Sequence, residues 1–126
     1  MSYKPKAYTS VSPYLIVDGA QGTMTFLSRV LDAEKLREMR NPDGTIMHAE
    51  MRIDDTVLML ADSTGNWPAV PAHVHIYVPD VDAAYQKALD AGAISIQAPV
   101  KKDDPDKRCG VKDAGGTTWW IATQKG

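Results

Sequence analysis

The sequence contains a single cysteine, Cys109, in a chain of 126 residues. One cysteine excludes a disulfide within the chain, and it excludes a zinc site made of several thiolates. Low cysteine use is also typical of proteins in a reducing compartment, where disulfides do not persist. We therefore expect a cytoplasmic protein whose fold depends on packing alone, with Cys109 as an unreactive thiol.

Long apolar runs and concentrated charge are also missing. No stretch approaches the ~20 apolar residues of a membrane span, and residues 1–6 lack the apolar core of a signal peptide. The formal net charge is −2, and no block of five or more like charges occurs. Nucleic acids and anionic membranes attract concentrated Lys and Arg, so we expect a soluble protein that binds neither.

The sequence does contain an alternation of side chains that is typical of strands, and a segment whose apolar residues have helical spacing interrupts it. Asp18 is the expected N-cap of a helix that continues to about Leu31. In this helix Ala20, Met24 and Leu27 follow one another at helical spacing, which places them on one face. The strands predicted around this helix are residues 11–17, 36–40, 45–53 and 56–61.

The same order of elements is predicted again after a polar linker at residues 62–71. Asp80 precedes a second helix, which Gly92 is expected to end because glycine favours the position just after a helix. A tight turn is expected at residues 113–116. The predicted strands of this half are residues 73–78, 93–100, 108–112 and 117–123.

The two predicted halves superimpose with a shift of about 61 positions, which brings Val17 onto Val78 and Ala61 onto Ala122. A repeat of this kind indicates one α+β domain built from two βαβββ modules. An ordinary α+β sandwich with chance periodicity is the alternative. The expected limits are residues 1–126 for the domain and residues 8–62 and 72–124 for the modules.

Six segments of the chain carry a resemblance to a known family. They are residues 12–18, 47–50, 57–62, 73–81, 110–113 and 118–123. Together they resemble the PhnB-like branch of the vicinal-oxygen-chelate superfamily, which also contains glyoxalase I, bleomycin-resistance proteins and extradiol dioxygenases. The resemblance covers nearly the whole chain. It implies a cup-shaped mixed sheet formed by the two modules, and frequent dimers in which modules of two chains complete one cavity.

The resemblance also implies where metal-dependent members hold their metal, on the first and last strand of each module. The usual ligands are His or Gln on the first strand and Glu on the last. Here these positions fall at Ser12, Met59, His73 and Trp120, and the two pairs have the same spacing of about 47 residues. Only His73 is a good ligand, because the Met59 thioether suits soft copper and the Trp120 N–H can only donate. We therefore expect no metal and no other cofactor.

The alternation assigns soft and aromatic side chains to the sheet face away from the helices. Such a wall suits a small organic molecule with an aromatic body, on which Trp120 would stack while Met59 adapts to its shape. Arg52, Tyr77 and Thr118 are expected on the same face. The predicted ligand-binding residues are Ser12, Tyr14, His48, Glu50, Met59, His73, His75 and Trp120.

Each of these residues also has an ordinary structural explanation. Trp120 can be core packing, and His48 with Glu50 can form a polar network between strands. His73 and His75 can hydrogen-bond the backbone or a dimer partner.

Three functions stay open at this point. The first is a metal-free module that binds a small, partly aromatic molecule as a symmetric homodimer. The second is a metal-dependent lyase, isomerase or dioxygenase, for which His48, Glu50 and His73 would form a displaced metal site. The third is a metal-free enzyme that uses His73, Glu50 or Arg108 for proton transfer.

Overall fold

The structure, a computed structural model, describes residues 2–126, so Met1 of the predicted domain lies outside the described residues. Strand, helix and three strands occur twice along the chain, and they form the two predicted βαβββ modules. The elements are β1 (Tyr14–Val17), α1 (Ala20–Leu31), β2 (Glu34–Arg40), β3 (Ile46–Ile53), β4 (Thr56–Asp62), β5 (Ala72–Tyr77), α2 (Val81–Asp90), β6 (Ile94–Lys101), β7 (Asp106–Lys112) and β8 (Thr117–Gln124).

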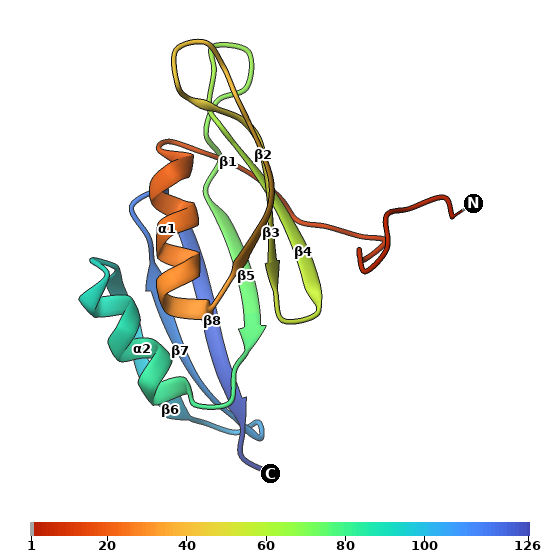
Figure 1. Ribbon diagram of the computed structural model, residues 1–126. Helices are drawn as coiled ribbons and strands as arrows, with labels where there is room; N and C mark the ends of the chain where they lie inside the picture. Colours follow the sequence, from red (N-terminus) through yellow and green to blue (C-terminus); the bar gives the residue numbers. More distant parts are fainter. Residues whose placement is uncertain (1) are drawn as a thin grey trace.

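Each module forms its own four-stranded mixed sheet, with the orders β1-β4-β3-β2 and β5-β8-β7-β6. The first strand of each module pairs in parallel with the last, and the other neighbours are antiparallel. Figure 1 shows both helices on the same side of the molecule, each against its own sheet. The sheet faces turned away from the helices carry no helix, and these two surfaces are called the open faces below.

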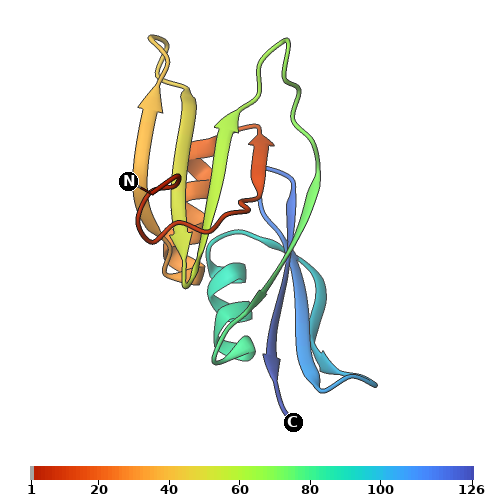
Figure 2. The ribbon, with the colours of Figure 1, turned by 90° about the vertical axis from the view of Figure 1, so that its right-hand side faces the viewer.

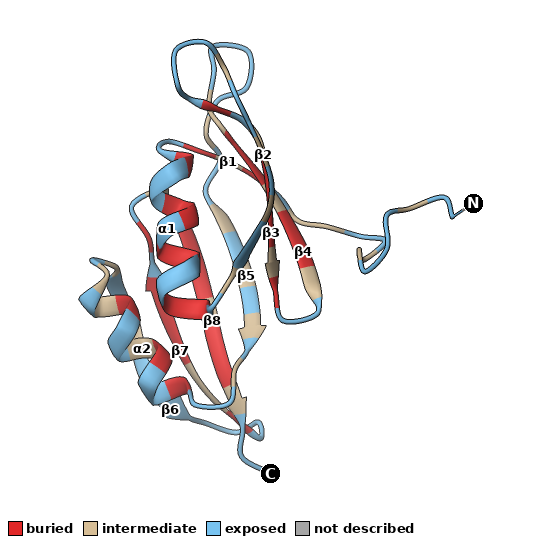
Figure 3. Ribbon diagram, in the orientation of Figure 1, coloured by how far each residue is buried: buried red, intermediate tan, exposed pale blue. Residues whose placement is uncertain are grey.

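The core lies between the helices and the sheets. Figure 3 shows it as buried residues along the inner side of α1 and on β3, β4, β7 and β8. Leu27, Leu60 and Trp119 are fully buried there. None of the helices in the described part of the chain is long and apolar enough to cross a membrane.

The start of α1 differs from the sequence-based expectation. Gly19, in a left-handed conformation with φ of 80°, is the N-cap, and Asp18 makes no capping hydrogen bond. The cap comes from Asp62 at the end of β4, whose Oδ1 accepts from the Gly19 and Ala20 amides at 3.0 and 2.8 Å. Its other oxygen accepts from the Ile46 amide at 2.7 Å. One carboxylate therefore ties a helix and two strands together, which a local capping rule does not detect.

Several strand limits also differ from the prediction. β1 begins at Tyr14 instead of residue 11, because Pro13 has no amide hydrogen and contributes only its carbonyl to the Met59 amide. β7 begins at Asp106, two residues before the predicted start at residue 108. On β3 the alternation that assigns His48 and Glu50 to the open face places Met47 on the helix side, yet Met47 is 50% exposed. A register shift between Met39 and Arg40 of the neighbouring β2 accompanies this exception.

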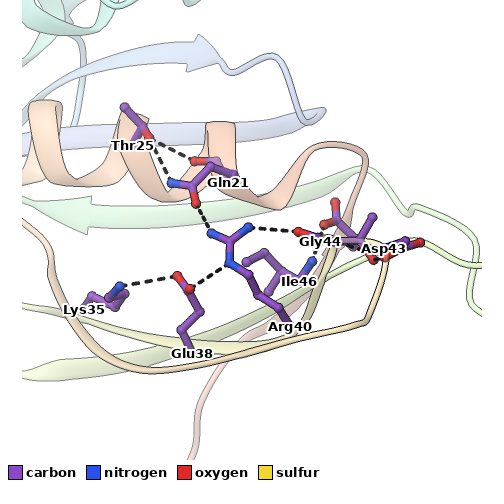
Figure 4. Close-up of polar contacts among 10 residues, drawn as sticks. Gln21, Thr25, Lys35, Glu38, Arg40, Asp43, Gly44 and Ile46 are labelled. Atoms are coloured by element: carbon purple, nitrogen blue, oxygen red, sulfur yellow. Dashed lines mark hydrogen bonds and ion pairs between the residues drawn. The ribbon is translucent and has the colours of Figure 1, made fainter.

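A polar cluster joins α1 to the β2–β3 hairpin (Figure 4). The Arg40 guanidinium donates to the carboxylate of Glu38 and to the carbonyl of Gly44, at 2.8 and 2.9 Å. It also donates to the side-chain oxygen of Gln21 on the first turn of α1. These contacts fix the hairpin against the helix, on the side of the sheet opposite the open face.

Candidate functional site

The open face of the first sheet carries a row of side chains from all four strands. Pairing in register places Tyr14 beside Met59, Met59 beside Glu50, and Glu50 beside Arg37. The period of two along each strand puts His48 on the same face, one step from Glu50. Three of the predicted ligand-binding residues on this sheet, Tyr14, His48 and Glu50, are joined by hydrogen bonds.

Glu50 is the centre of this network and is only 4% exposed. Its Oε2 lies 2.7 Å from His48 Nε2, and the Tyr8 hydroxyl donates to its Oε1. The Arg37 guanidinium is 4.0 Å away. Burial alone would raise the pKa of this carboxyl. The hydrogen bonds from Tyr8 and His48 and the charge of Arg37 outweigh burial and hold the pKa below its usual value, so Glu50 is a buried anion.

Tyr14 is at the other end of the network. Its hydroxyl lies 2.9 Å from His48 Nδ1, and the two rings are tilted with centroids 5.5 Å apart. Tyr14 is 49% exposed, whereas Glu50 is buried. The network therefore leads from the interior of the sheet, through His48, to a tyrosine at the surface.

The segment before β1 crosses the open face of the first sheet, as Figure 2 shows. Arg52 donates to the Ala7 carbonyl at 3.2 Å, and the Val57 amide donates to the Thr9 hydroxyl at 3.3 Å. Between these contacts Tyr8 reaches Glu50, and this hydrogen bond raises the pKa of the tyrosine. Sequence patterns do not reveal Tyr8, because it lies in a segment without strand or helix periodicity.

The open face of the second sheet carries a different set of groups. Trp120 Nε1 donates to His73 Nδ1 at 3.0 Å, and the two rings are stacked at 11° with centroids 6.2 Å apart. Trp120 is half-buried here and does not belong to the core, whereas its neighbour Trp119 does. The ring lies over Gly110 of β7, where an added Cβ would come within 2.5 Å of Trp120 Cζ3.

Arg108 hydrogen-bonds several other polar side chains of this face. Arg108 Nε donates to His75 Nε2 at 3.1 Å, and its other nitrogens donate to Asp104 and Asp106 at 3.1 and 2.9 Å. The Tyr77 hydroxyl donates to Asp106 as well, at 2.7 Å. Burial, and then the charge of Arg108, lower the pKa of His75, which favours the neutral ring that accepts from Arg108.

Each open face is hollowed. On the first sheet a hollow of about 550 Å³ lies beside Tyr14. On the second sheet a hollow of about 410 Å³ lies beside Trp120 and Arg108. The larger one is lined by Tyr14, Ile16, Asn41, Ile46, Met47, Ala61, Asp62, Thr64 and Trp67.

Trp67 belongs to the stretch expected to be only a linker, and it is 68% exposed. Its loop is anchored to β1 on both sides, because the Ser63 amide donates to the Val17 carbonyl and the Val70 amide to the Ile16 carbonyl. Backbone hydrogen bonds between Thr64 and Trp67 close the loop on itself. An anchored loop thus carries an exposed aromatic side chain at the rim of the larger hollow.

The family profile that describes the Glyoxalase/Bleomycin resistance protein/Dioxygenase superfamily matches residues 8–121. The chain belongs to this superfamily. It is 32% identical over 121 residues to an uncharacterised protein of Mycobacterium bovis, covering 87% of this chain and 80% of that protein.

Solved structures of the superfamily share the fold. TnmS3, an antibiotic binding protein from Streptomyces sp. CB03234, superimposes with a TM-score of 0.70 at 15% identity, covering 93% of this chain and 99% of that one. A PhnB protein from Bacillus cereus, named as a putative 3-demethylubiquinone-9 3-methyltransferase, superimposes with a TM-score of 0.70 at 19% identity. The match covers 91% of this chain and 99% of that one. The resemblance to the PhnB-like branch is thereby confirmed at the level of the fold.

The superfamily's metal positions do not hold a ligand set in this chain. Trp120 directs its N–H at His73 Nδ1 and so occupies the lone pair of that nitrogen. Met59 lies opposite Tyr14, and Ser12 precedes β1. A thioether, a hydroxyl and an indole do not bind the zinc, nickel, iron or manganese ions that such sites would take. The side chains at the usual site therefore do not fit a metal.

The displaced metal site is not assembled within one chain either. His48 and Glu50 adjoin on the first sheet, but His73 lies on the second sheet against Trp120. In residues 2–126 no group of three His, Cys, Asp or Glu side chains could hold a metal ion.

Cys109 lies on the opposite side of the second sheet, in the core. It is fully buried, and burial raises the pKa of the thiol to about 11. The thiol therefore stays protonated near neutral pH, which leaves it without the thiolate that reactive cysteines need.

Proposed function

We propose that the protein binds a small, partly aromatic organic molecule on its open faces without the help of a metal ion. The observation that carries this proposal is a set of exposed aromatic side chains. Hydrogen bonds hold Tyr14 and Tyr77 in place, and Trp67 projects from a loop whose backbone is anchored. Tyr14, Trp67 and Tyr77 are 49%, 68% and 60% exposed. Rings held in this way offer stacking surface at little cost in side-chain entropy.

The chemistry around the hollows supports an organic ligand. Met47 and Ile16 add apolar and adaptable surface beside Tyr14 and Trp67. A hollow of about 550 Å³ has the size of ordinary small-molecule pockets. TnmS3, which has the same fold, is described as an antibiotic binding protein, and a role in resistance or detoxification suits this chain as well.

We propose further that two copies form a symmetric dimer in which modules of both chains, residues 8–62 and 72–124, complete one cup. The exposure of β5 and β6 supports this, because β6 leaves Ile94 and Ile96 uncovered and β5 leaves Tyr77 uncovered. Light scattering at high concentration should give twice the chain mass of 13.8 kDa. A monomeric mass would contradict the shared cup.

The single cysteine, Cys109, favours a cytoplasmic setting.

Titration of the purified protein against a panel of aromatic antibiotics tests the binding proposal, with tryptophan fluorescence as the signal. Trp67→Ala and Trp120→Ala should each weaken binding of compounds that dock at their own hollow. Arg29→Ala, on the exposed side of α1, is the matched control and should leave binding unchanged. Elemental analysis belongs in the same experiment. Absence of binding, together with stoichiometric nickel, zinc, iron or manganese, would favour the metal-dependent enzyme instead.

A further inference from the structure

The hydrogen-bonded chain on the first sheet ends at the larger hollow. Tyr14 is the member that lines this hollow, whereas Tyr8, His48 and Glu50 do not. The polar network and the aromatic hollow therefore meet at one residue, Tyr14.

The positions of the protons along this chain follow from its geometry. The Glu50 carboxylate only accepts, so the 2.7 Å contact requires a proton on His48 Nε2. In the neutral ring the other nitrogen, Nδ1, then has a free lone pair and accepts the Tyr14 O–H at 2.9 Å. With its own hydrogen directed at His48, the Tyr14 oxygen presents its lone pairs and can accept a proton from a ligand.

We propose that Tyr14, His48 and Glu50 form a proton relay that binds aromatic ligands bearing a phenolic hydroxyl and holds them as phenolates in the hollow beside Trp67. This inference rests on the proposed function and specifies the ligand class. The ligand O–H bond breaks and its proton goes to the Tyr14 oxygen. The Tyr14 proton moves to His48 Nδ1, and the ligand oxygen keeps the electron pair. No oxidant or reductant is involved.

The charges around the relay match this transfer. The transfer makes His48 an imidazolium, which lies between the Glu50 carboxylate and the new phenolate. Tyr8 and Arg37 are the other titratable groups that contact Glu50, and both favour its anionic form. Opposite charges in this order stabilise the transferred state.

The rest of the hollow favours an aromatic body over a second polar group. Both oxygens of Asp62 are already used by backbone amides of α1 and β3. The Asn41 amide donates to Thr45, and the Thr64 hydroxyl accepts from the Trp67 amide. Tyr14 is therefore the polar group best placed to select the ligand.

Umbelliferone and its methyl ether are suitable probes, because the first carries the phenolic hydroxyl and the second lacks it. The fluorescence excitation spectrum of umbelliferone distinguishes the phenol from the phenolate. At a pH where free umbelliferone is mostly neutral, the bound form should show the phenolate band. In Tyr14→Phe the dissociation constant of umbelliferone should rise about tenfold and the phenolate band should disappear, whereas the methyl ether should change less than about twofold.

Tyr85→Phe is the matched control, because it removes a tyrosine hydroxyl, which donates to Ser95, from outside both the network and the hollow. It should retain the phenolate band. Equal phenolate fractions in wild type and Tyr14→Phe, or equal loss in both variants, would overturn the relay while leaving the binding proposal intact. If neither coumarin bound the wild-type protein, aromatic binding at this hollow would fail, and the relay with it. Circular dichroism of each variant checks that it is folded.

Discussion

The two halves of the chain have the same order of elements but bury them to different degrees. α1 buries seven side chains, including Met24, Phe26 and Leu27, whereas α2 buries only Val81, Ala84 and Ala88. Among the strands, the first strand of each half differs most, because β1 buries Leu15 and Val17 whereas β5 has no buried residue. The edge strands β2 and β6 have no buried residue in either half. Figure 3 shows the contrast between the helices, with more buried residues along α1 than along α2.

In the second half, where the helix buries fewer side chains, one large residue compensates for the smaller buried surface. Trp119 is fully buried, and its Nε1 donates to the buried Asp113 carboxylate at 2.9 Å. Asp113 also accepts from the Thr117 amide and so closes the β7–β8 turn. One topology is thus stabilised in two ways, by many aliphatic contacts in the first half and by one anchored indole in the second. The halves should therefore differ in how they respond to single substitutions.

The largest expected effect comes from Trp119→Ala, which removes the anchor of the second half. Loss of a buried tryptophan side chain costs about 4 kcal/mol of unfolding free energy, and it leaves the Asp113 carboxylate with one partner fewer. Urea denaturation measures this loss. Trp67→Ala removes the same side chain at an exposed position and should change stability by less than about 0.5 kcal/mol. Similar losses in the two variants would show that packing is not concentrated at Trp119.

A second substitution in the same half tests its open face. Gly110→Ala places a methyl group within 2.5 Å of the Trp120 ring, so the ring must move away from His73. Overpacking of this kind costs about 2 kcal/mol, and the indole N–H resonance of Trp120 should shift. Gly65→Ala is the control, because an added Cβ there meets no atom within 4 Å. An unmoved resonance would show that Trp120 is not held by this close approach.

The matching test in the first half concerns the charge of Glu50. Glu50→Gln keeps the shape but loses the anion that Tyr8 and His48 contact, which should cost about 1.5 kcal/mol at pH 7. The folded-state pKa of Glu50 is lowered, so its contribution is present above the unfolded pKa and is lost as the pH falls through the folded value. The stability difference between wild type and variant should therefore begin to shrink as the pH falls below about 4.3, the ordinary pKa of a glutamate. It should vanish once the pH is below the lowered folded-state pKa of Glu50.

Urea denaturation at several pH values measures this difference. Glu34→Gln is the control, since Glu34 is an exposed residue of β2 and its replacement should have an effect below about 0.5 kcal/mol at every pH. A stability difference for Glu50→Gln that stayed constant into acid would contradict an ionised, hydrogen-bonded Glu50.

Much of the fold can be predicted from the sequence because its signals are local. Asp80 was expected to lead α2 and does so, since its side chain accepts from the Ala83 amide three residues on. Asp18 was expected to do the same for α1, and this was wrong, because the cap comes from Asp62 at the far end of the module. Capping across strands depends on the folded structure, so no pattern of neighbouring residues reports it.

In the candidate site, too, some residues can be predicted from local patterns and others depend on the folded structure. Tyr14, His48 and Glu50 could be placed on one face by alternation alone, and the structure joins them by hydrogen bonds. Tyr8 and Trp67 could not, because they lie in segments without a repeating pattern and reach the face only through the path of the backbone. The limits of the modules and the residues that touch a ligand stay predictions.

The smallest expected effect tests the intrinsic stability of the two helices, apart from how much of each helix is buried. Gly22 lies on the exposed side of α1, and an added Cβ would meet no atom within 4 Å. Gly22→Ala should therefore raise stability by about 0.8 kcal/mol, the difference in helix propensity between the two residues. Ala83→Gly makes the reverse change at an exposed position of α2 and should lower stability by a similar amount. Equal and opposite shifts in urea denaturation would mean that the two helices differ in burial and not in intrinsic stability. A much smaller loss in α2 would instead indicate that this helix is already frayed and that the second half depends on Trp119 even more heavily.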